Sequence, residues 1–322
     1  MIAKSVLITG GSGSWGQAFT RRLLRDSLAE RICIYSRGEH RQEEMAREFV
    51  SLDPDKRLRF RIGDVRDRDR LELAMRGCDV VVHAAALKVV PICEADPIEA
   101  IKTNVLGAQH VIEAALRTGV KKVMALSTDK AAASNTLYGA TKFAAERLFI
   151  ASNVYTGEGI PTRFAVVRYG NVAGSQGSCI PLFQRLRAQG AKALPITDPR
   201  MTRFFFALDE AVDFTVSSIS MMAGGEIFIP KITAKRIVDI AREIAPELPH
   251  EIVGIRPGEK LNEVLISEDE SRTALELPDR YVLRPTFAGW SADHLPGAKP
   301  VPEGFIYCSN RAIEPQRLEA AE

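Results

Sequence analysis

The sequence predicts an α/β protein with a doubly wound parallel sheet and a smaller C-terminal region. In the first half, short runs rich in β-branched residues alternate with amphipathic stretches, which is the pattern of successive βαβ units. A glycine-rich turn joins the first run to the first amphipathic stretch, and proline and glycine become frequent after about residue 170. We therefore expect a sheet-forming domain over residues 1–170 and a second region over 171–322 that partly interleaves with it.

The elements of the first domain follow from the periodicity of its apolar residues. Short apolar runs predict strands, and apolar residues spaced three and four apart predict helices. The predicted strands cover residues 5–9, 31–36, 57–63, 79–84, 122–127 and 163–169. The predicted helices lie near residues 14–26, 40–50, 67–76, 96–118 and 137–153.

The second region has shorter apolar runs. Its predicted elements are strands at 226–230 and 251–255 and helices near 181–189, 208–222 and 233–245. The tail after about residue 284 is rich in proline and glycine, and we predict no structure for it.

Composition and charge argue against several classes of protein. With 322 residues, 46% hydrophobic and 26% charged, the chain is typical of globular proteins. Its net charge of +2 gives no reason to expect nucleic acid or an acidic membrane as a partner. The five cysteines are scattered without a Cys-x-x-Cys pair, so neither a metal site nor a disulfide framework is expected. Because no signal-peptide pattern or membrane-spanning apolar run of about 20 residues occurs, we expect a soluble cytoplasmic protein.

The glycine-rich turn predicts a Rossmann-like dinucleotide site. The stretch "LITGGSGSWG" covers residues 7–16 and lies between the first strand and the first helix. Small residues let the backbone approach a pyrophosphate, and the helix N-terminus offers unpaired N–H groups to its charge. The turn residues expected to contact the cofactor are Gly10, Ser12, Gly13, Ser14, Trp15 and Gly16.

The turn after the second strand favours NADP over NAD. An acidic residue there would accept hydrogen bonds from the 2′-hydroxyl of the adenosine ribose. This chain instead has Ser36 and Arg37, with Arg41 one helical turn later. An arginine beside a small hydroxyl suits a 2′-phosphate, whereas the nearby Glu39 leaves NAD as the alternative.

The next two strand ends are expected to line the same cofactor, because ligands of open α/β sheets bind at the carboxyl ends of the strands. Asp64, followed by Val65, ends the third strand, where a carboxylate can accept a hydrogen bond from the adenine amino group. Ala84 and Ala86 follow the fourth strand, where small side chains let the cofactor lie against the backbone. A simple packing role is the alternative for each.

Tyr138 and Lys142 form a Tyr-x-x-x-Lys pair on one face of a predicted helix. An ammonium near a phenol favours the phenolate, so we expect Lys142 to lower the pKa of Tyr138. The tyrosine could then take a proton from a substrate hydroxyl while hydride leaves the same carbon for a nicotinamide.

Asp129 and Lys130 pose a separate question, because a redox reaction alone has no need of an adjacent acid and amine. They follow the fifth strand, directly after Thr128, which can hold a substrate hydroxyl. Once a sugar hydroxyl is oxidised to a ketone, the neighbouring C–H becomes acidic. A base can then remove that proton while an acid protonates the next hydroxyl and expels water. A surface ion pair at a strand end is the alternative.

Together these motifs resemble the extended short-chain dehydrogenase/reductase superfamily and, more closely, the inverting UDP-N-acetylglucosamine 4,6-dehydratases that open pseudaminic acid biosynthesis. The resemblance covers residues 5 to about 283. Its most specific segments are "ALSTDKAA", "LYGATK", "VVRYGNVAGSQGS" and "GIRPGEKLNEVLI".

The resemblance implies a reaction. NADP⁺ would oxidise C4 of the sugar with Tyr138 as base, and Thr128 would hold the C4 hydroxyl. Lys130 would remove the C5 proton, and Asp129 would protonate the departing C6 hydroxyl. Hydride would return to C6, and C5 would be protonated from the opposite face to give an L-configured 4-keto-6-deoxy sugar.

The resemblance also implies substrate contacts and partners. Lys88, Thr103 and Asn104 would line the boundary between nicotinamide and sugar, and Asn171 would contact the substrate. The residues that would meet the UDP portion are Ile180, Pro181, Gln184, Thr202 and Arg256. A homo-oligomer, dimer or hexamer, and an aminotransferase acting next in the pathway are implied likewise.

The chain departs from the family pattern where Ala133-Ser134 replace the usual Asn-Pro before the tyrosine. Several alternatives therefore remain open. They are a retaining 4,6-dehydratase, a UDP-hexose 4-epimerase or 4-reductase, and a non-catalytic NADP-sensing protein. The epimerase and the reductase have no use for Asp129 and Lys130, and a sensing protein would typically lose Tyr138 or Lys142.

Overall fold

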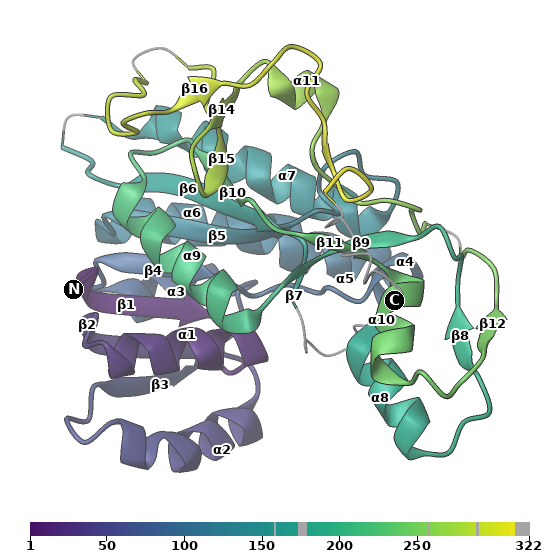
Figure 1. Ribbon diagram of the computed structural model, residues 1–322. Coiled ribbons are helices and arrows are strands. Elements are labelled where there is room, and N and C mark those ends of the chain that lie inside the picture. Colours follow the sequence, from purple (N-terminus) through teal and green to yellow (C-terminus); the bar gives the residue numbers. More distant parts are fainter. Residues whose placement is uncertain (158, 173–178, 257, 288–289, 313–322) are drawn as a thin grey trace.

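A ten-stranded sheet with helices on both faces forms the centre of the computed structural model (Figure 1). The structure describes residues 1–157, 159–172, 179–256, 258–287 and 290–312. Residues 173–178, which belong to one of the predicted motifs, lie outside these ranges. The α/β class predicted from the sequence is confirmed.

Seven parallel strands form the larger part of the sheet. In spatial order they are β3 (Leu58–Ile62), β2 (Ala29–Ser36), β1 (Ala3–Thr9), β4 (Val80–His83), β5 (Lys122–Thr128), β6 (Arg163–Tyr169) and β10 (Ile227–Pro230). The central strands are fully buried, as at Val6, Leu7 and Ile8, because parallel strands are covered on both faces. The predictions for these strands are confirmed.

Three antiparallel strands extend the sheet beyond β10. They are β15 (Arg280–Leu283), β14 (Ala274–Glu276) and β16 (Lys299–Pro300). The C-terminal part of the chain therefore returns to the edge of the central sheet, and the tail after residue 284, for which no structure was predicted, supplies one of these strands.

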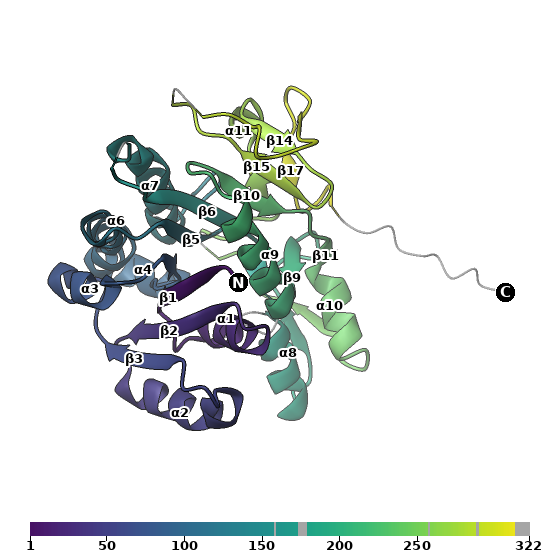
Figure 2. The ribbon, with the colours of Figure 1, turned by 90° about the vertical axis from the view of Figure 1, so that its left-hand side faces the viewer.

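Helices cover both faces of the sheet (Figure 2). One face carries α1 (Ser14–Arg25) and α9 (Leu208–Met221), and the other carries α3 (Arg68–Met75), α6 (Gly107–Thr118) and α7 (Leu137–Ala151). The helix α2 (Glu39–Phe49) packs beside β2 and β3. Short 3₁₀ turns follow α2 and α7, at Val50–Leu52 and Ser152–Tyr155.

The helix predicted over 96–118 is present but changes its pitch. It consists of α5 (Pro97–Ile101), a π-helical turn (Lys102–Leu106) and α6. The preceding α4 (Val90–Ala95) was not predicted. Single π-helical turns within α-helices are frequent at functional sites, and this one contains Thr103 and Asn104.

A smaller group of elements has its own apolar core. It contains α8 (Cys179–Ala188), β8 (Leu194–Ile196), α10 (Ile237–Ile244) and β12 (His250–Ile252). The side chains of Phe183, Leu194, Ile196 and Ala241 are buried between them. The strand predicted at 251–255 is wrong in its bounds, because β12 ends at Ile252.

Two small sheets connect this group with the central sheet. One contains β7 (Asn171–Val172), β9 (Thr202–Phe206) and β11 (Ala234–Arg236), and the other pairs β13 (Val264–Ile266) with β17 (Tyr307–Cys308). The short helix α11 (Glu268–Ser271) follows β13. The helix predicted from residue 233 begins only at Ile237, because Ala234–Arg236 pair with β9 instead.

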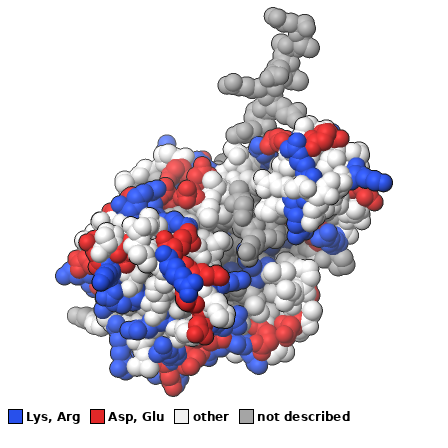
Figure 3. All heavy atoms as spheres, turned by 90° about the horizontal axis from the view of Figure 1, so that it is seen from below, with Lys and Arg blue, Asp and Glu red and all other residues white. Residues whose placement is uncertain are grey.

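Positive and negative side chains are interspersed on the face shown in Figure 3. Among the helices that the structure describes, none combines the length and the apolar composition needed to cross a membrane.

Candidate active site

The glycine turn is shaped for close approach of a ligand to the backbone. Gly10 has a φ of +68°, and a Cβ there would lie 2.9 Å from the backbone nitrogen of Ala85. A Cβ on Gly16 would lie 2.5 Å from the carbonyl oxygen of Gly11. The N-cap of α1 is Gly13, which has no side chain that could cap the N–H groups of the first helical turn. The helix therefore begins with N–H groups available to an anion, and a pyrophosphate fits this cradle.

The other residues predicted in this turn play different parts. Ser12 donates a hydrogen bond to the hydroxyl of Ser36 (Oγ to Oγ, 2.8 Å). Ser14 is the first residue of α1, and the indole of Trp15 stacks on Phe19 with ring centroids 4.9 Å apart. The turn and the end of β2 are thus connected through one hydrogen bond.

At the end of β2, Gln42 is a residue that sequence reasoning missed. Its amide nitrogen lies 2.9 Å from the Oγ of Ser36 and 3.0 Å from the carbonyl oxygens of Ser36 and Arg61. Gln42 is buried, whereas Arg37 and Arg41 are exposed. The Ser36 hydroxyl therefore accepts from both Ser12 and Gln42, and its own proton is left to donate to another group.

Asp64 lies after β3, as predicted, but its carboxylate is occupied. Arg66 donates to it from the backbone and from the guanidinium at 2.7–3.0 Å. Partial burial favours the neutral carboxyl, but the hydrogen bonds from Arg66 outweigh it and lower the pKa of Asp64. Arg37 is 3.7 Å from the same carboxylate. The neighbouring Val65 is buried, and its carbonyl oxygen lies 3.2 Å from Nδ1 of His110.

The loop after β4 contains Ala84, Ala86 and Lys88, and Asn104 holds it in place. The Asn104 amide accepts from the Leu87 N–H (2.8 Å) and donates to the Leu87 carbonyl (2.9 Å) and to Thr141 (3.0 Å). All the polar atoms of Asn104 thus contact protein, which indicates that it positions the loop before Lys88. Thr103 is buried, and within the described residues its hydroxyl has no hydrogen-bond partner.

Tyr138 and Lys142 are both buried on α7, but their electrostatics differ from the prediction. Burial raises the pKa of Tyr138 to about 12, and the nearby cation that opposes this is Lys130, not Lys142. The Lys142 ammonium instead donates to the carbonyl of Leu126 at 2.7 Å, and burial lowers its pKa to about 8. The predicted lowering of the tyrosine pKa by Lys142 is therefore wrong for this state of the protein.

Gly139 brings α7 against the loop that follows β5. A Cβ at Gly139 would lie 2.2 Å from the carbonyl oxygen of Lys130 and 2.3 Å from the hydroxyl of Ser134. The helix therefore packs directly on the backbone of Lys130, which places Tyr138 beside the acid–amine pair.

Asp129 and Lys130 form a partly buried pair, with side chains 0% and 28% exposed, so the pair is not the fully exposed surface ion pair considered above. Asp129 is 0% exposed, and its Oδ1 accepts from the Lys130 ammonium at 3.0 Å and from the Thr128 hydroxyl at 2.9 Å. The same ammonium lies 3.3 Å from the Oδ1 of Asn171. The structure thus brings together four of the predicted residues, from the ends of β5 and the start of β7.

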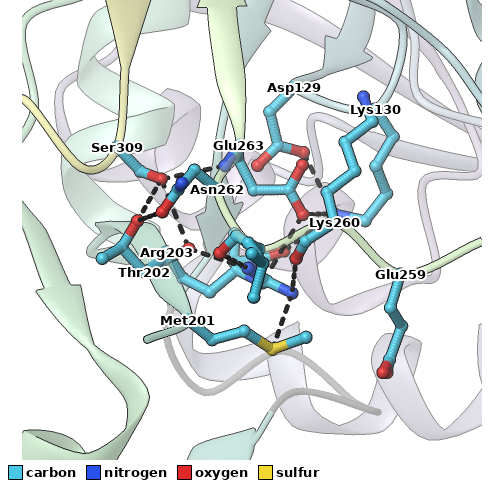
Figure 4. Close-up of polar contacts among 12 residues, drawn as sticks. Asp129, Lys130, Met201, Thr202, Arg203, Glu259, Lys260, Asn262, Glu263 and Ser309 are labelled. Carbon is cyan, nitrogen blue, oxygen red and sulfur yellow. Dashed lines mark hydrogen bonds and ion pairs between the residues drawn. The ribbon is translucent and has the colours of Figure 1, made fainter. Parts of the chain in front are cut away.

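Glu263 is a further carboxylate at this pair that the sequence did not reveal (Figure 4). Its Oε1 lies 3.7 Å from the Lys130 ammonium and 3.5 Å from Nε of Arg203, and its side chain is 4% exposed. Burial by itself lowers the pKa of Lys130, but the charges of Asp129 and Glu263 outweigh it and raise the pKa. Glu263 belongs to the segment "GIRPGEKLNEVLI", yet nothing local distinguishes it from the half-buried Glu259, the other carboxylate of that segment.

The residues predicted for the UDP portion lie in different surroundings. Thr202 is buried and bonded through its hydroxyl to Asn262 (2.7 Å) and Ser309 (2.6 Å). Arg256 is exposed, with its guanidinium 3.9 Å from Glu259. The predicted residues of α8 are Ile180 and Pro181, which are half-buried, and Gln184, which is exposed.

Relatives of known name agree with this site. Residues 6–285 match the family described as polysaccharide biosynthesis protein. Two proteins of Campylobacter jejuni, both called UDP-N-acetylglucosamine 4,6-dehydratase (inverting), are similar to this chain. That of serotype O:2 is 49% identical over 98% of this chain and 96% of its own, and that of serotype O:23/36 is 52% identical over 88% and 83%. A protein of Rickettsia conorii called UDP-glucose 4-epimerase is 42% identical over 87% of this chain and 82% of its own.

Solved structures share the fold. Pen from Bacillus thuringiensis has a TM-score of 0.87 and 35% identity, with 97% of this chain and 94% of that chain covered. The dTDP-glucose 4,6-dehydratase DesIV from Streptomyces venezuelae, solved with NAD and TYD bound, has a TM-score of 0.69 and 25% identity over 80% and 86%. The resemblance predicted from the motifs is confirmed.

Proposed function

From the premise that this chain belongs to the polysaccharide biosynthesis protein family, we propose that it is an NADP-dependent UDP-N-acetylglucosamine 4,6-dehydratase that inverts C5. The product would be UDP-2-acetamido-2,6-dideoxy-β-L-arabino-hexos-4-ulose. The observation that carries the proposal is the partly buried hydrogen bond of 3.0 Å from Lys130 to the buried carboxylate of Asp129, beside Tyr138. The names of the two Campylobacter jejuni relatives support the same reaction.

The first step is oxidation at C4. The bound nicotinamide dinucleotide supplies the hydride acceptor. Tyr138 takes the proton of the C4 hydroxyl, and Thr128 orients that hydroxyl. Burial raises the pKa of Tyr138 to about 12, so the phenol must first release its own proton to solvent before it can act as the base. The Lys130 ammonium is the cation in place to stabilise the phenolate that results.

The second step is loss of water. The Lys130 ammonium passes a proton across its 3.0 Å hydrogen bond to Asp129, which creates an amine and a carboxylic acid together. The amine takes the C5 proton while the acid protonates the C6 hydroxyl. The C6–O bond breaks, water leaves, and the electrons of the C5–H bond form the C5=C6 double bond. Return of hydride to C6 and protonation of C5 from the opposite face complete the inversion.

NADP is the proposed cofactor because of the end of β2. Ser36 has a hydroxyl proton to donate, and the exposed Arg37 and Arg41 supply positive charge for a 2′-phosphate. NAD, the ligand in the DesIV structure, is the alternative.

The substrate is proposed to extend from the nicotinamide toward the smaller group of elements. Lys88, Thr103 and Asn171 would line the sugar. The Thr103 hydroxyl has no hydrogen-bond partner among the described residues, which supports a ligand contact there. Thr202, Arg256 and α8 would meet the UDP portion. The division into a cofactor-binding part, residues 1–170, and a mainly substrate-binding part, residues 171–322, remains a proposal on the same basis.

We also propose a homo-oligomer. Exposed apolar side chains occur on three segments that contact one another: α5, the π-helical turn and α7. They are Ile98, Ile101, Leu106 and Phe143. Such a patch on neighbouring helices is typical of an interface. A cytoplasmic location and an aminotransferase that consumes the 4-keto product complete the proposal.

The deciding experiment is incubation with UDP-N-acetylglucosamine in heavy water, followed by mass spectrometry and NMR. The proposal requires loss of one water, deuterium at C5 and the L configuration. A dehydrated product with the D configuration would indicate a retaining dehydratase. A product isomeric with the substrate would indicate a 4-epimerase, as the name of the Rickettsia conorii relative suggests for that protein.

A further inference from the structure

Lys130 has a second carboxylate neighbour that comes from a distant part of the chain. Glu263 immediately precedes β13, and its Oε1 faces the Lys130 ammonium at 3.7 Å, whereas Asp129 is 3.0 Å from the same ammonium (Figure 4). Glu263 and Asp129 each retain one carboxylate oxygen, Oε2 and Oδ2, that has no partner in the described part of the chain. The amine thus contacts two buried carboxylates, each of which has one oxygen without a partner among the described residues.

Glu263 is held by its own surroundings. Arg203, on β9, lies 3.5 Å from its carboxylate and donates to the carbonyls of Leu261 (3.1 Å) and Lys260 (2.9 Å). The Glu263 backbone exchanges hydrogen bonds with Ser309: its N–H donates to Oγ at 2.9 Å, and its carbonyl accepts from the N–H at 2.8 Å. The carboxylate is therefore fixed by contacts that do not involve Lys130.

The charges around the amine come from several elements. Asp129 and Glu263 are the carboxylates that face it, Tyr138 on α7 faces it as a phenol, and Lys260 is a further cation close enough to interact with it. Lys260 itself donates to the carbonyl of Ala132 at 2.9 Å, which holds it on the same loop. Two negative charges at this distance favour the ammonium, because desolvated charges interact strongly.

We propose that Glu263 is a positioning residue for Lys130: its carboxylate, held by Arg203, keeps the amine protonated and directed at Asp129 until the reaction draws the proton away. This inference rests on the proposed function only for its catalytic consequence. The same negative charge makes the amine a stronger base once it has given its proton to Asp129, which helps it to remove a proton from carbon.

The test measures the protonation of Lys130 directly. Wild-type protein and Glu263→Gln are acetylated with trace acetic anhydride over a range of pH, and the labelling of Lys130 is read by peptide mass spectrometry. The Lys130 side chain is 28% exposed, so the reagent can reach it. Glutamine keeps the shape and removes the charge. We expect the midpoint of Lys130 labelling to move to lower pH by about one to three units.

Two variants control this measurement. Glu276→Gln removes a carboxylate from Lys231, 2.6 Å away at the sheet edge, and should leave the Lys130 midpoint unchanged. Glu263→Asp keeps the charge one methylene further away and should give a smaller shift in the same direction. It also decides the matter if the glutamine variant does not fold. Midpoints that coincide with wild type in the folded Glu263 variants would overturn the inference.

The kinetic readout separates this inference from the proposed function. If the protein dehydrates UDP-N-acetylglucosamine, the pH dependence of deuterium incorporation at C5 should shift in Glu263→Gln by the same amount as the labelling midpoint. If the labelling midpoint shifts in Glu263→Gln but the wild-type protein does not dehydrate UDP-N-acetylglucosamine, the role of Glu263 is upheld and the proposed dehydratase function is rejected. A dehydration profile that does not follow the labelling would reject the catalytic consequence.

Discussion

Two charged clusters contact α7, one through Glu146 within the helix and the other at Lys130, whose backbone packs on Gly139, and they are built differently. In the first, Arg168 of β6 is completely buried, and all five of its N–H groups donate at 2.6–3.0 Å to Glu146, Glu270 and the carbonyl of Leu265. In the second, Lys130 contacts Asp129 and Glu263 at 3.0 and 3.7 Å, and each carboxylate keeps one oxygen without a partner among the described residues.

The clusters differ in how completely their polar groups are paired, and this difference indicates the role of each. A buried network with every donor paired holds elements together, here β6, α7 and α11, and gains nothing from a ligand. A buried network with unpaired oxygens is costly unless a substrate or a moving proton satisfies it. On this basis we assign a structural role to the Arg168 cluster and a catalytic role to the Lys130 cluster.

The largest expected effect is on catalysis, when Lys130 is removed. Lys130→Ala should reduce deuterium incorporation at C5 by about 10²–10⁴-fold, because a positioned base contributes that much. Binding of NADP, measured by fluorescence titration, should remain within about threefold, since the glycine turn is untouched. Full turnover in this variant would show that another group removes the C5 proton.

Disrupting the Arg168 cluster should instead lower the stability of the protein. Arg168→Met leaves two carboxylates without their cation, and we expect the free energy of unfolding to fall by about 3–5 kcal/mol. Arg187→Met is the matched control, because it breaks the exposed pair with Glu247 and should cost below about 1 kcal/mol. Denaturant unfolding compares the two variants. Equal losses would contradict the structural role given to Arg168.

Gly139→Ala tests the helix that joins both clusters. The added Cβ would overlap the Lys130 carbonyl, so α7 must move away from the acid–amine pair. We expect a loss of about 1–3 kcal/mol in stability, as for overpacking, together with a lower kcat. Ala140→Gly, at the exposed neighbouring position, controls for helix propensity and should leave kcat unchanged. A Gly139 variant with normal kcat would show that the close contact is not needed.

The smallest effect is on the pH dependence of stability. Burial tends to raise the pKa of both Glu270 and Glu263. For Glu270 the charge and hydrogen bonds of Arg168 outweigh burial and lower the pKa. For Glu263 the charge of Asp129 adds to burial, and the pKa is raised. Glu270 therefore contributes stability above pH 4.5 that is lost as the pH falls through its folded pKa. Glu263 does the opposite: its contribution is present below pH 4.5 and is lost as the pH rises.

Thermal unfolding of single variants checks these signs. Relative to wild type, Glu270→Gln should show a weaker loss of stability on acidification. Glu263→Gln should show a weaker loss as the pH rises above 4.5. If both variants changed the same limb of the profile, the contrast between the two clusters would not hold.

Most of the parallel sheet could be predicted from sequence, because its signals are local. Buried strands such as β1 and β5 are continuous β-branched runs, and the helices between them follow the 3.6-residue period. The glycine turn, the Tyr138–Lys142 pair and the Asp129–Lys130 pair were equally readable, since each lies within one short segment at a strand end.

Other features depend on residues far apart in the chain. The strands β14 and β16 are too short to be recognised alone; β14 forms on β15, and β16 forms on β14. Gln42 acts through hydrogen bonds to the ends of β2 and β3, and Asn104 through hydrogen bonds to the loop after β4; the sequence does not show these segments as neighbours. The pKa of Tyr138 was predicted in the wrong direction because burial, which spacing does not report, outweighs the helical pair.

By itself, the sequence determined the α/β class, the positions of the parallel strands and the residues at their carboxyl ends, because periodicity and turn chemistry act within a few residues. Only the tertiary structure decided that Glu263 and Arg203 lie beside Lys130, and that Asp129 is completely buried there. Burial and charge are sums over every part of the chain that packs around a group, so they exist only once the distant segments have come together.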